Sequence, residues 1–188
     1  MRMFYPSIED HCLYVDRDTT IKTIYEHLHC KDIDKIIVQD KDGKDIGYVP
    51  LCHLLRLLTR DIKFCDYLIE QFEWKEIQKA MQGEVVASPL HVSLIKHFIC
   101  LPDKQAFDFH HALVIIESNK ERLSSILESE ASCIVVAHCD FVSQSLINKA
   151  KEEKILLLKT PLSAITAANA LWMQMPVGKM MERFHLHG

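Results

Sequence analysis

Three uninterrupted apolar runs in the second half of the chain constrain its fold most strongly. They are Ala112–Ile116, Cys133–Ala137 and Ile155–Leu158. None alternates between apolar and polar residues as a half-exposed strand does, and helix-like segments of roughly ten residues separate them. Strands of this kind occur in parallel sheets that helices cover on both faces. We therefore expect an α/β domain with a mainly parallel sheet, preceded by the short strand Glu84–Ala87.

The first part of the chain predicts a smaller unit with a different order of elements. Apolar residues at helical spacing over 21–28 predict a helix after a short strand at 12–15. The turn signal Asp40-Lys41-Asp42-Gly43 separates two further strands, so that a β-hairpin is expected. Pro50 suits the first turn of the next helix, whose leucines recur at helical spacing. The expected order is β-α-β-β-α.

These patterns divide the chain into four segments. The small unit spans 1–62, and a helical connector over 63–82 ends before Gly83. The α/β domain spans 83–178, and a tail follows over 179–188. No stretch rich in proline, glycine or serine marks the boundary near Gly83, so the two parts are expected to pack together.

The small unit resembles a single CBS motif over Thr20 to Leu58, including the run Asp45-Ile46-Gly47-Tyr48-Val49. In that family the motif normally pairs with a second copy to bind adenine nucleotides. The resemblance implies a ligand site near Ile46, Gly47, Tyr48 and His53. It also implies a homodimer, because a lone motif leaves its sheet face and its half-site incomplete. The family typically has Thr or Ser and then Asp where this chain has Pro50 and His53, so the implied site is degenerate.

Residues 83–177 resemble a DRTGG domain, with the best agreement over Ser143–Ala150 and Ile155–Pro161. The family's Thr-Gly-Gly turn is replaced here by Ala137-His138-Cys139. This turn follows the carboxyl end of a predicted parallel strand, where open α/β sheets bind ligands. His138 and Cys139 are therefore candidate ligand contacts, and Thr160, in the turn after the next strand, is a third.

The order of the two units is similar to the CBS–DRTGG regulatory region of family II, manganese-dependent inorganic pyrophosphatases. The closing run Met175–Met181 looks like the entry into a second CBS motif, which would be truncated within 179–188. None of the catalytic segments of those pyrophosphatases has a counterpart here. The resemblance implies a regulatory, ligand-sensing module without enzymatic activity. It would bind AMP, ADP, ATP or an adenine dinucleotide, need no cofactor, and act with a catalytic protein partner.

Composition excludes several other classes of protein. The formal net charge is −4, with acidic and basic residues interspersed, which argues against binding to nucleic acid. The longest apolar runs fall short of the ~18 residues of a membrane span, and the first residues lack the apolar core of a signal peptide. Seven cysteines, an odd number without a C-x-x-C pair, are typical of a reducing compartment. We expect a cytoplasmic protein that binds neither membrane nor nucleic acid.

Two other hypotheses stay open at this point. The main one is a scaffold that keeps the same fold for dimerisation or docking but binds no ligand, which Pro50, His53 and His138 favour. The other is an unrecognised enzyme that uses Cys139 or His138. Histidine pairs such as His110-His111 point to different faces of a strand, so no metal site is expected.

Overall fold

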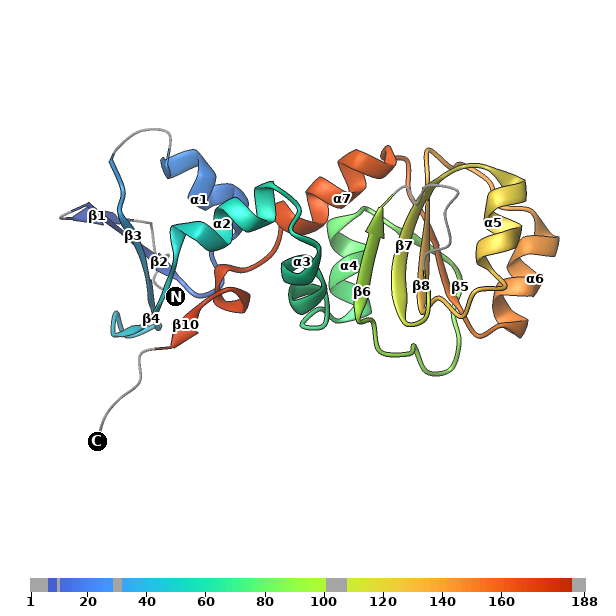
Figure 1. The fold of residues 1–188 in the computed structure, drawn as a ribbon, viewed down its shortest axis with the longest axis horizontal. Helices are drawn as coiled ribbons and strands as arrows, with labels where there is room; N and C mark the ends of the chain where they lie inside the picture. The colour runs from blue at the N-terminus through green and yellow to red at the C-terminus, as the bar shows by residue number, and fades with distance from the viewer. Residues whose placement is uncertain (1–6, 10, 29–31, 101–107, 184–188) are drawn as a thin grey trace. The chain divides into compact units, whose positions relative to one another are not determined.

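The computed structural model describes residues 7–9, 11–28, 32–100 and 108–183 of the chain, which form two compact units (Figure 1). Unit 1 combines the residues up to Asp61 with those from Trp172 onward, and unit 2 is Ile62–Leu171. The expected connector over 63–82 thus lies in unit 2, and residues 172–178 lie in unit 1. The domain limits drawn from the sequence stay a prediction.

Unit 1 contains a mixed five-stranded sheet with the strand order β1-β2-β3-β4-β10. Helix α1 (Ile21–Leu28) connects the parallel strands β2 and β3, β3 and β4 form an antiparallel hairpin, and helix α2 (Leu51–Leu58) follows β4. The expected order β-α-β-β-α is confirmed, while the edge strands β1 and β10 were not expected. The strands are β1 (Ser7–Glu9), β2 (Cys12–Asp16), β3 (Lys35–Gln39), β4 (Asp45–Val49) and β10 (Glu182–Arg183).

Alternation of side chains gives the sheet of unit 1 one buried face. Leu13 and Val15 of β2 and Ile36 and Val38 of β3 are completely buried, whereas their neighbours along each strand are partly or fully exposed. Helices α1 and α2 contribute further buried side chains, Ile24 among them. The opposite face of the sheet therefore stays partly open.

The residues after α7 (Ala164–Met173) belong to unit 1 through backbone hydrogen bonds. Ile21 N donates to Met175 O at 3.0 Å, and Val177 N donates to Thr19 O at 2.8 Å. After a 3₁₀ turn at Val177–Lys179, β10 pairs antiparallel with β4, and Glu182 lies opposite Tyr48. The run Met175–Met181, which looked like the entry into a second CBS motif, thus leads into an edge strand of the first sheet.

Unit 2 is an α/β unit with the strand order β5-β9-β8-β7-β6. The four strands β6, β7, β8 and β9 are parallel, and β5 is antiparallel to β9, so the expected mainly parallel sheet is confirmed. The strands are β5 (Glu84–Ala87), β6 (His97–Cys100), β7 (Ala112–Glu117), β8 (Cys133–Ala137) and β9 (Leu156–Lys159). The helices are α3 (Ile62–Ile69), α4 (Trp74–Ala80), α5 (Lys120–Ile126), α6 (Gln144–Glu152) and the greater part of α7.

The core of unit 2 forms around the three apolar runs that the sequence singled out. Every residue of β8 is buried, as are five of the six residues of β7. Asn119 caps α5 by accepting a hydrogen bond from Arg122 N at 3.0 Å. Ser143 stands at the start of α6, where its hydroxyl contacts that of Ser145 at 3.1 Å. No helix within the described residues has the length and apolar character that crossing a membrane requires.

Candidate functional site

The structure separates the seven candidate ligand contacts into two groups. Ile46, Gly47 and Tyr48 lie on β4 and His53 lies in the first turn of α2, all in unit 1. The other three, His138, Cys139 and Thr160, follow the carboxyl ends of β8 and β9 in unit 2.

In unit 1, the carboxylate of Glu182 on β10 lies between Tyr48 and His53. The Tyr48 hydroxyl donates to Glu182 Oε2 at 2.6 Å. His53 Nε2 lies 3.6 Å from Glu182 Oε1, and His53 Nδ1 lies 3.4 Å from the carbonyl oxygen of Met180. The carboxylate raises the pKa of Tyr48 above its ordinary value, because the hydrogen bond and the negative charge both favour the protonated phenol.

Gly47 lets β10 approach β4 closely. A Cβ at this position would lie 2.4 Å from the carbonyl oxygen of Glu182 and 2.5 Å from Cγ of Met181. Both distances are far below a normal contact, so no larger residue can stand here while β10 keeps its place. Ile46, next to Gly47, is half-buried on the opposite face of the strand.

The sequence did not identify Glu182 as a member of this cluster. Its partner Tyr48 is 134 residues away along the chain, and β10 has only two residues. No motif or periodicity marks such a short strand. The likeness of Met175–Met181 to a CBS entry segment is the nearest signal in the sequence, and it does not predict that the chain pairs with β4.

In unit 2, His138 pairs with Glu117 at the end of β7. His138 Nδ1 lies 3.2 Å from Glu117 Oε2, and Glu117 Oε1 accepts a hydrogen bond from Ala164 N at 2.9 Å. The carboxylate thus connects the turn after β8 to the first turn of α7. His138 has a φ of 48°, in the left-handed region that the family's glycine turn would adopt at lower cost. The side chains of His138 and Glu117 are 62% and 43% exposed, so this pair contributes little to stability.

Cys139 and Thr160 are buried, and their polar groups bond within unit 2. The Cys139 thiol donates to the carbonyl oxygen of Phe141 at 3.2 Å, and the residue is 5% exposed. The Thr160 hydroxyl donates to Met81 O at 2.7 Å and accepts from Leu162 N at 3.2 Å. In this structure, the hydroxyl of Thr160 therefore holds together the turns that follow α4 and β9.

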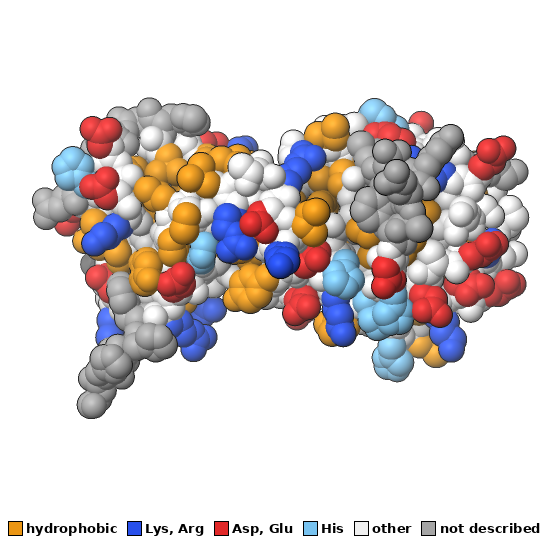
Figure 2. Space-filling model, viewed as in Figure 1, with side chains coloured by type: hydrophobic (Ala, Val, Ile, Leu, Met, Phe, Trp, Pro, Cys, Tyr) orange, Lys and Arg blue, Asp and Glu red, His pale blue; other side chains and the backbone are white. Residues whose placement is uncertain are grey.

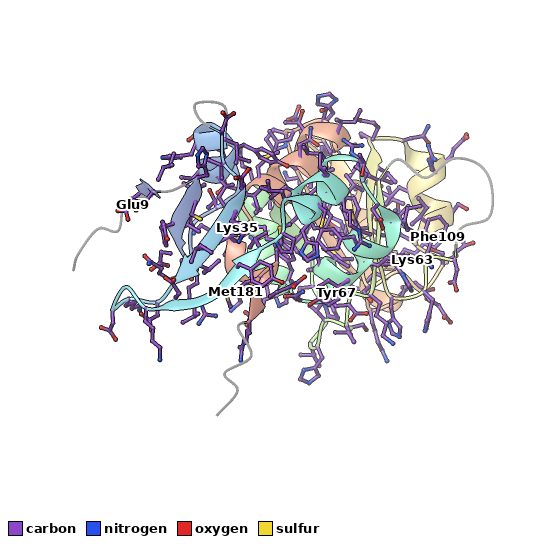
Figure 3. All side chains as sticks on the ribbon, turned by 60° about the vertical axis from the view of Figure 1, so that its left-hand side comes forward. Glu9, Lys35, Lys63, Tyr67, Phe109 and Met181 are labelled. Atoms are coloured by element: carbon purple, nitrogen blue, oxygen red, sulfur yellow. The ribbon has the colours of Figure 1, made fainter. Side chains whose placement is uncertain are left out.

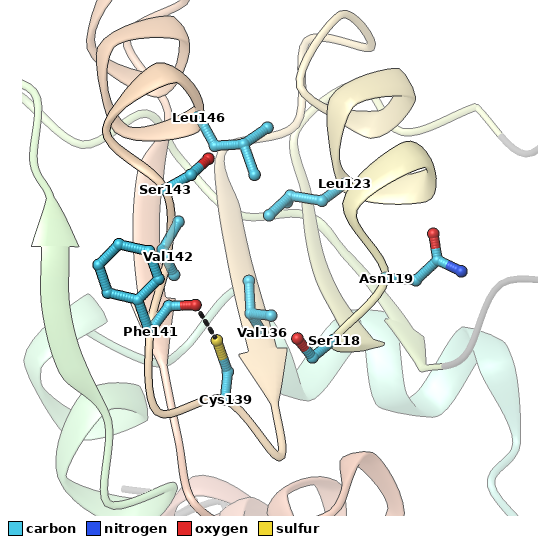
Figure 4. Close-up of a pocket in the computed structure, with 9 residues that line it drawn as sticks. All are labelled: Ser118, Asn119, Leu123, Val136, Cys139, Phe141, Val142, Ser143 and Leu146. Carbon is cyan, nitrogen blue, oxygen red and sulfur yellow. Dashed lines mark hydrogen bonds between the residues drawn. The ribbon is translucent and has the colours of Figure 1, made fainter.

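Cys139 also lines a pocket of about 190 Å³ between α5 and α6 (Figure 4). Apolar side chains form most of its wall, and polar residues at the starts of the two helices complete it. The volume is below that of usual sites for drug-sized ligands, so the pocket cannot enclose a whole nucleotide. The lining residues are Ser118, Asn119, Leu123, Val136, Cys139, Phe141, Val142, Ser143 and Leu146.

The arrangement provides little for catalysis or metal binding. The Cys139 thiol donates to a backbone carbonyl oxygen, an acceptor that does not withdraw its proton as an imidazole would. Among the residues that the structure describes, no three side chains of His, Cys, Asp or Glu gather in a way that could hold a metal ion. The expectation that His110 and His111 point to different faces of a strand is wrong, because both lie in the turn before β7 and their ring centroids are 3.9 Å apart. His110 pairs with the carboxylate of Glu130.

Comparison with known proteins identifies a solved structure with a similar fold. Over 92% of its length, the chain is similar to the CBS and DRTGG domains of the regulatory region of Clostridium perfringens pyrophosphatase, solved in complex with the activator diadenosine tetraphosphate. The TM-score is 0.66, the sequence identity is 17%, and 77% of that chain is covered. The chain has the fold of a CBS–DRTGG regulatory region. The resemblance found in the sequence is thereby confirmed.

The sequence comparisons agree with this fold. The chain is 22% identical over 191 aligned positions to a probable manganese-dependent inorganic pyrophosphatase of Thermotoga maritima. The match covers 95% of this chain and 34% of the pyrophosphatase, so the chain spans about a third of the length of that relative. No protein-family model matches the chain.

Proposed function

We propose that this chain is a regulatory, ligand-sensing module that binds an adenine nucleotide at a degenerate site on unit 1. The observation that carries the proposal is the likeness over 92% of the chain to a regulatory region solved with diadenosine tetraphosphate. The proposed contacts are Ile46, Gly47, Tyr48 and His53. His138, Cys139 and Thr160 of unit 2 remain proposed ligand contacts as well.

The side chains of the unit 1 site supply the chemistry that a nucleoside needs. The Tyr48 ring is partly exposed and provides a face on which an adenine base can stack. His53 provides ring nitrogens that hydrogen-bond a sugar hydroxyl, and its side chain is 19% exposed. Pro50 has no N–H at the start of α2, so this end of the helix offers a phosphate one donor fewer.

The proposal includes a homodimer formed through unit 1. Tyr14, Ile37 and Tyr48 lie side by side across β2, β3 and β4, on the face of the sheet that its helices leave partly open. On α2, Leu55 and Leu58 are 61% and 53% exposed. Figure 2 shows hydrophobic side chains gathered over the helices of unit 1. A second copy would cover such apolar surface and would bring two half-sites together.

The proposed module regulates and does not catalyse. A catalytic protein partner, whose activity this chain would regulate, belongs to the same proposal. A cytoplasmic setting belongs to the same proposal, because seven cysteines, an odd number without a C-x-x-C pair, are typical of a reducing compartment.

A second function, a ligand-free scaffold for dimerisation or protein docking, has one observation in its favour. Glu182 places a carboxylate against the two polar side chains of the proposed site, where it opposes the negative charge of a nucleotide. Pro50 weakens phosphate binding further. In this alternative the fold and the dimer are kept, and no nucleotide binds.

A thermal-shift screen separates the two functions. The panel contains AMP, ADP, ATP and diadenosine tetraphosphate, with GTP as the control for the base. A ligand at about one hundred times its dissociation constant stabilises the folded state by about 2.7 kcal/mol, which raises the melting temperature by several degrees. A saturable shift with an adenine nucleotide, absent with GTP, supports the sensor. A flat response from a folded dimer supports the scaffold.

Size-exclusion chromatography with light scattering tests the dimer separately. A monomer has a mass of 21.8 kDa, so the proposed homodimer has twice that value. The matched variant Leu55→Asp places a charge in the exposed surface of α2 without disturbing a buried residue. A wild-type mass equal to the monomer at micromolar concentration would exclude the dimer.

A further inference from the structure

The C-terminal strand β10 lies where a ligand of unit 1 would have to bind. Its pairing with β4 brings Glu182 opposite Tyr48 and places the backbone of Glu182 directly over Gly47. Three of the four proposed nucleotide contacts, Gly47, Tyr48 and His53, therefore already contact the segment 180–182 of the same chain.

These contacts occupy the polar groups that a nucleotide would use. The Tyr48 hydroxyl is committed to Glu182 Oε2 at 2.6 Å, a short hydrogen bond to a charged acceptor, which is stronger than one between neutral groups. An acceptor lies beside each ring nitrogen of His53: the Glu182 carboxylate at 3.6 Å and the Met180 carbonyl at 3.4 Å. The backbone of Glu182 also covers the face of Gly47.

The charge of Glu182 adds to this occlusion. Nucleotide phosphates are anions, and a carboxylate a few ångströms away repels them even through water. The Glu182 side chain is 47% exposed, so it can turn away from Tyr48 and His53 without unfolding the core of unit 1. In this position the carboxylate of Glu182 therefore opposes nucleotide binding, but its side chain can rotate away from the site.

We propose that Glu182 makes an autoinhibitory contact, in which its carboxylate occupies Tyr48 and His53 in the ligand-free protein and leaves them when a nucleotide binds. This inference rests on the proposed function, because it concerns the same site. It predicts that the affinity of unit 1 for an adenine nucleotide is set by how firmly β10 holds this position.

The test measures nucleotide affinity in variants of Glu182 by isothermal titration calorimetry on the full chain. Glu182→Gln removes the charge and keeps the shape, and Glu182→Ala removes the contacts altogether. The matched control is Glu9→Gln, which removes the same charge from β1 at the opposite edge of the same sheet. Glu9 and Met181, the neighbour of Glu182, are both labelled in Figure 3.

Both Glu182 variants are expected to bind ADP and diadenosine tetraphosphate about five- to tenfold more tightly than the wild type, with the larger gain for Glu182→Ala. Glu9→Gln is expected to stay within twofold of the wild type. Melting curves of all variants verify that each is folded. Binding by the variants with no detectable binding by the wild type also supports the proposal.

Two outcomes overturn the proposal in different ways. If the wild type binds and the Glu182 variants bind equally or more weakly, the carboxylate does not inhibit, while the proposed function stands. If neither the wild type nor any folded variant binds an adenine nucleotide, the proposed function itself fails and the autoinhibitory contact fails with it.

Discussion

Replacing Thr160 by valine decides whether this residue supports the fold of unit 2 or contacts a ligand. The side chain is completely buried. Its hydroxyl donates to Met81 O at 2.7 Å and accepts from Leu162 N at 3.2 Å. Valine has nearly the same shape as threonine and can make neither hydrogen bond.

The size of the effect follows from what the hydroxyl leaves behind. Met81 has no exposed surface, so its carbonyl oxygen loses this partner in a place that water does not reach. A buried polar group left without a partner costs about 1–3 kcal/mol. The N–H of Leu162, in a partly exposed residue, adds a smaller cost. We expect Thr160→Val to lower the free energy of unfolding by about 1–4 kcal/mol.

Urea denaturation followed by circular dichroism measures this change. Thr160→Ser is the matched control, because it keeps the hydroxyl and removes one buried methyl group, at a cost of about 1 kcal/mol. If Thr160→Val unfolds within about 0.5 kcal/mol of the wild type, in the usual range of a harmless surface substitution, the structural role is refuted. A loss of ligand binding at unchanged stability would assign Thr160 to a ligand site instead.

Three further predictions concern the close approach of β10, a partly buried tyrosine and the thiol in the pocket. Gly47→Ala is expected to destabilise the protein by about 1–3 kcal/mol, because the new Cβ meets the backbone of Glu182. The control in the same urea assay is Gly83→Ala, because a Cβ at Gly83 would have no neighbour nearer than 3.4 Å. Burial raises the pKa of Tyr25 to about 12. The stability that depends on its protonated phenol is therefore complete below pH 10 and is lost as the pH rises from 10 to about 12. The absorbance titration of the wild type minus that of Tyr25→Phe should have its midpoint near pH 12. A midpoint near pH 10 would contradict the burial of the phenol. Cys139, which is buried and donates to Phe141 O, should react with a thiol reagent far more slowly than the exposed Cys52, and fast selective modification of Cys139 would revive the hypothesis of an enzyme.

The sequence predicted those elements whose signal is local and strong. Continuous apolar runs identified β7, β8 and the core of β9, and the Asp-rich turn with Pro50 identified the hairpin and α2. A fully buried strand and a tight turn are each specified by a few consecutive residues, so the local sequence pattern is enough to predict them. The edge strands were missed because β1, β6 and β10 have two to four residues each and take their place from pairing with a neighbour.

The candidate site was predictable in part for the same reason. His138 was a candidate ligand contact because it follows a strand, and Tyr48 and His53 were candidates because of the likeness to the CBS motif. The structure adds a carboxylate partner to each of the three residues. Glu182 and Glu117 reach these residues from other strands, and nothing local in the sequence connects the partners. Thr160 had the right place after a parallel strand, but its orientation into the interior depends on packing that the sequence pattern does not specify.

The most direct test of the nucleotide-sensing proposal is a calorimetric titration of the full chain with diadenosine tetraphosphate, alongside the variant His53→Ala. The proposal predicts saturable binding to the wild type. His53→Ala, folded by circular dichroism, should bind about tenfold more weakly, a loss of about 1.4 kcal/mol. No saturable heat from the folded wild type or from the folded variant Glu182→Ala, with this ligand and with AMP, ADP and ATP, would contradict the proposal and leave the scaffold as the function of this fold.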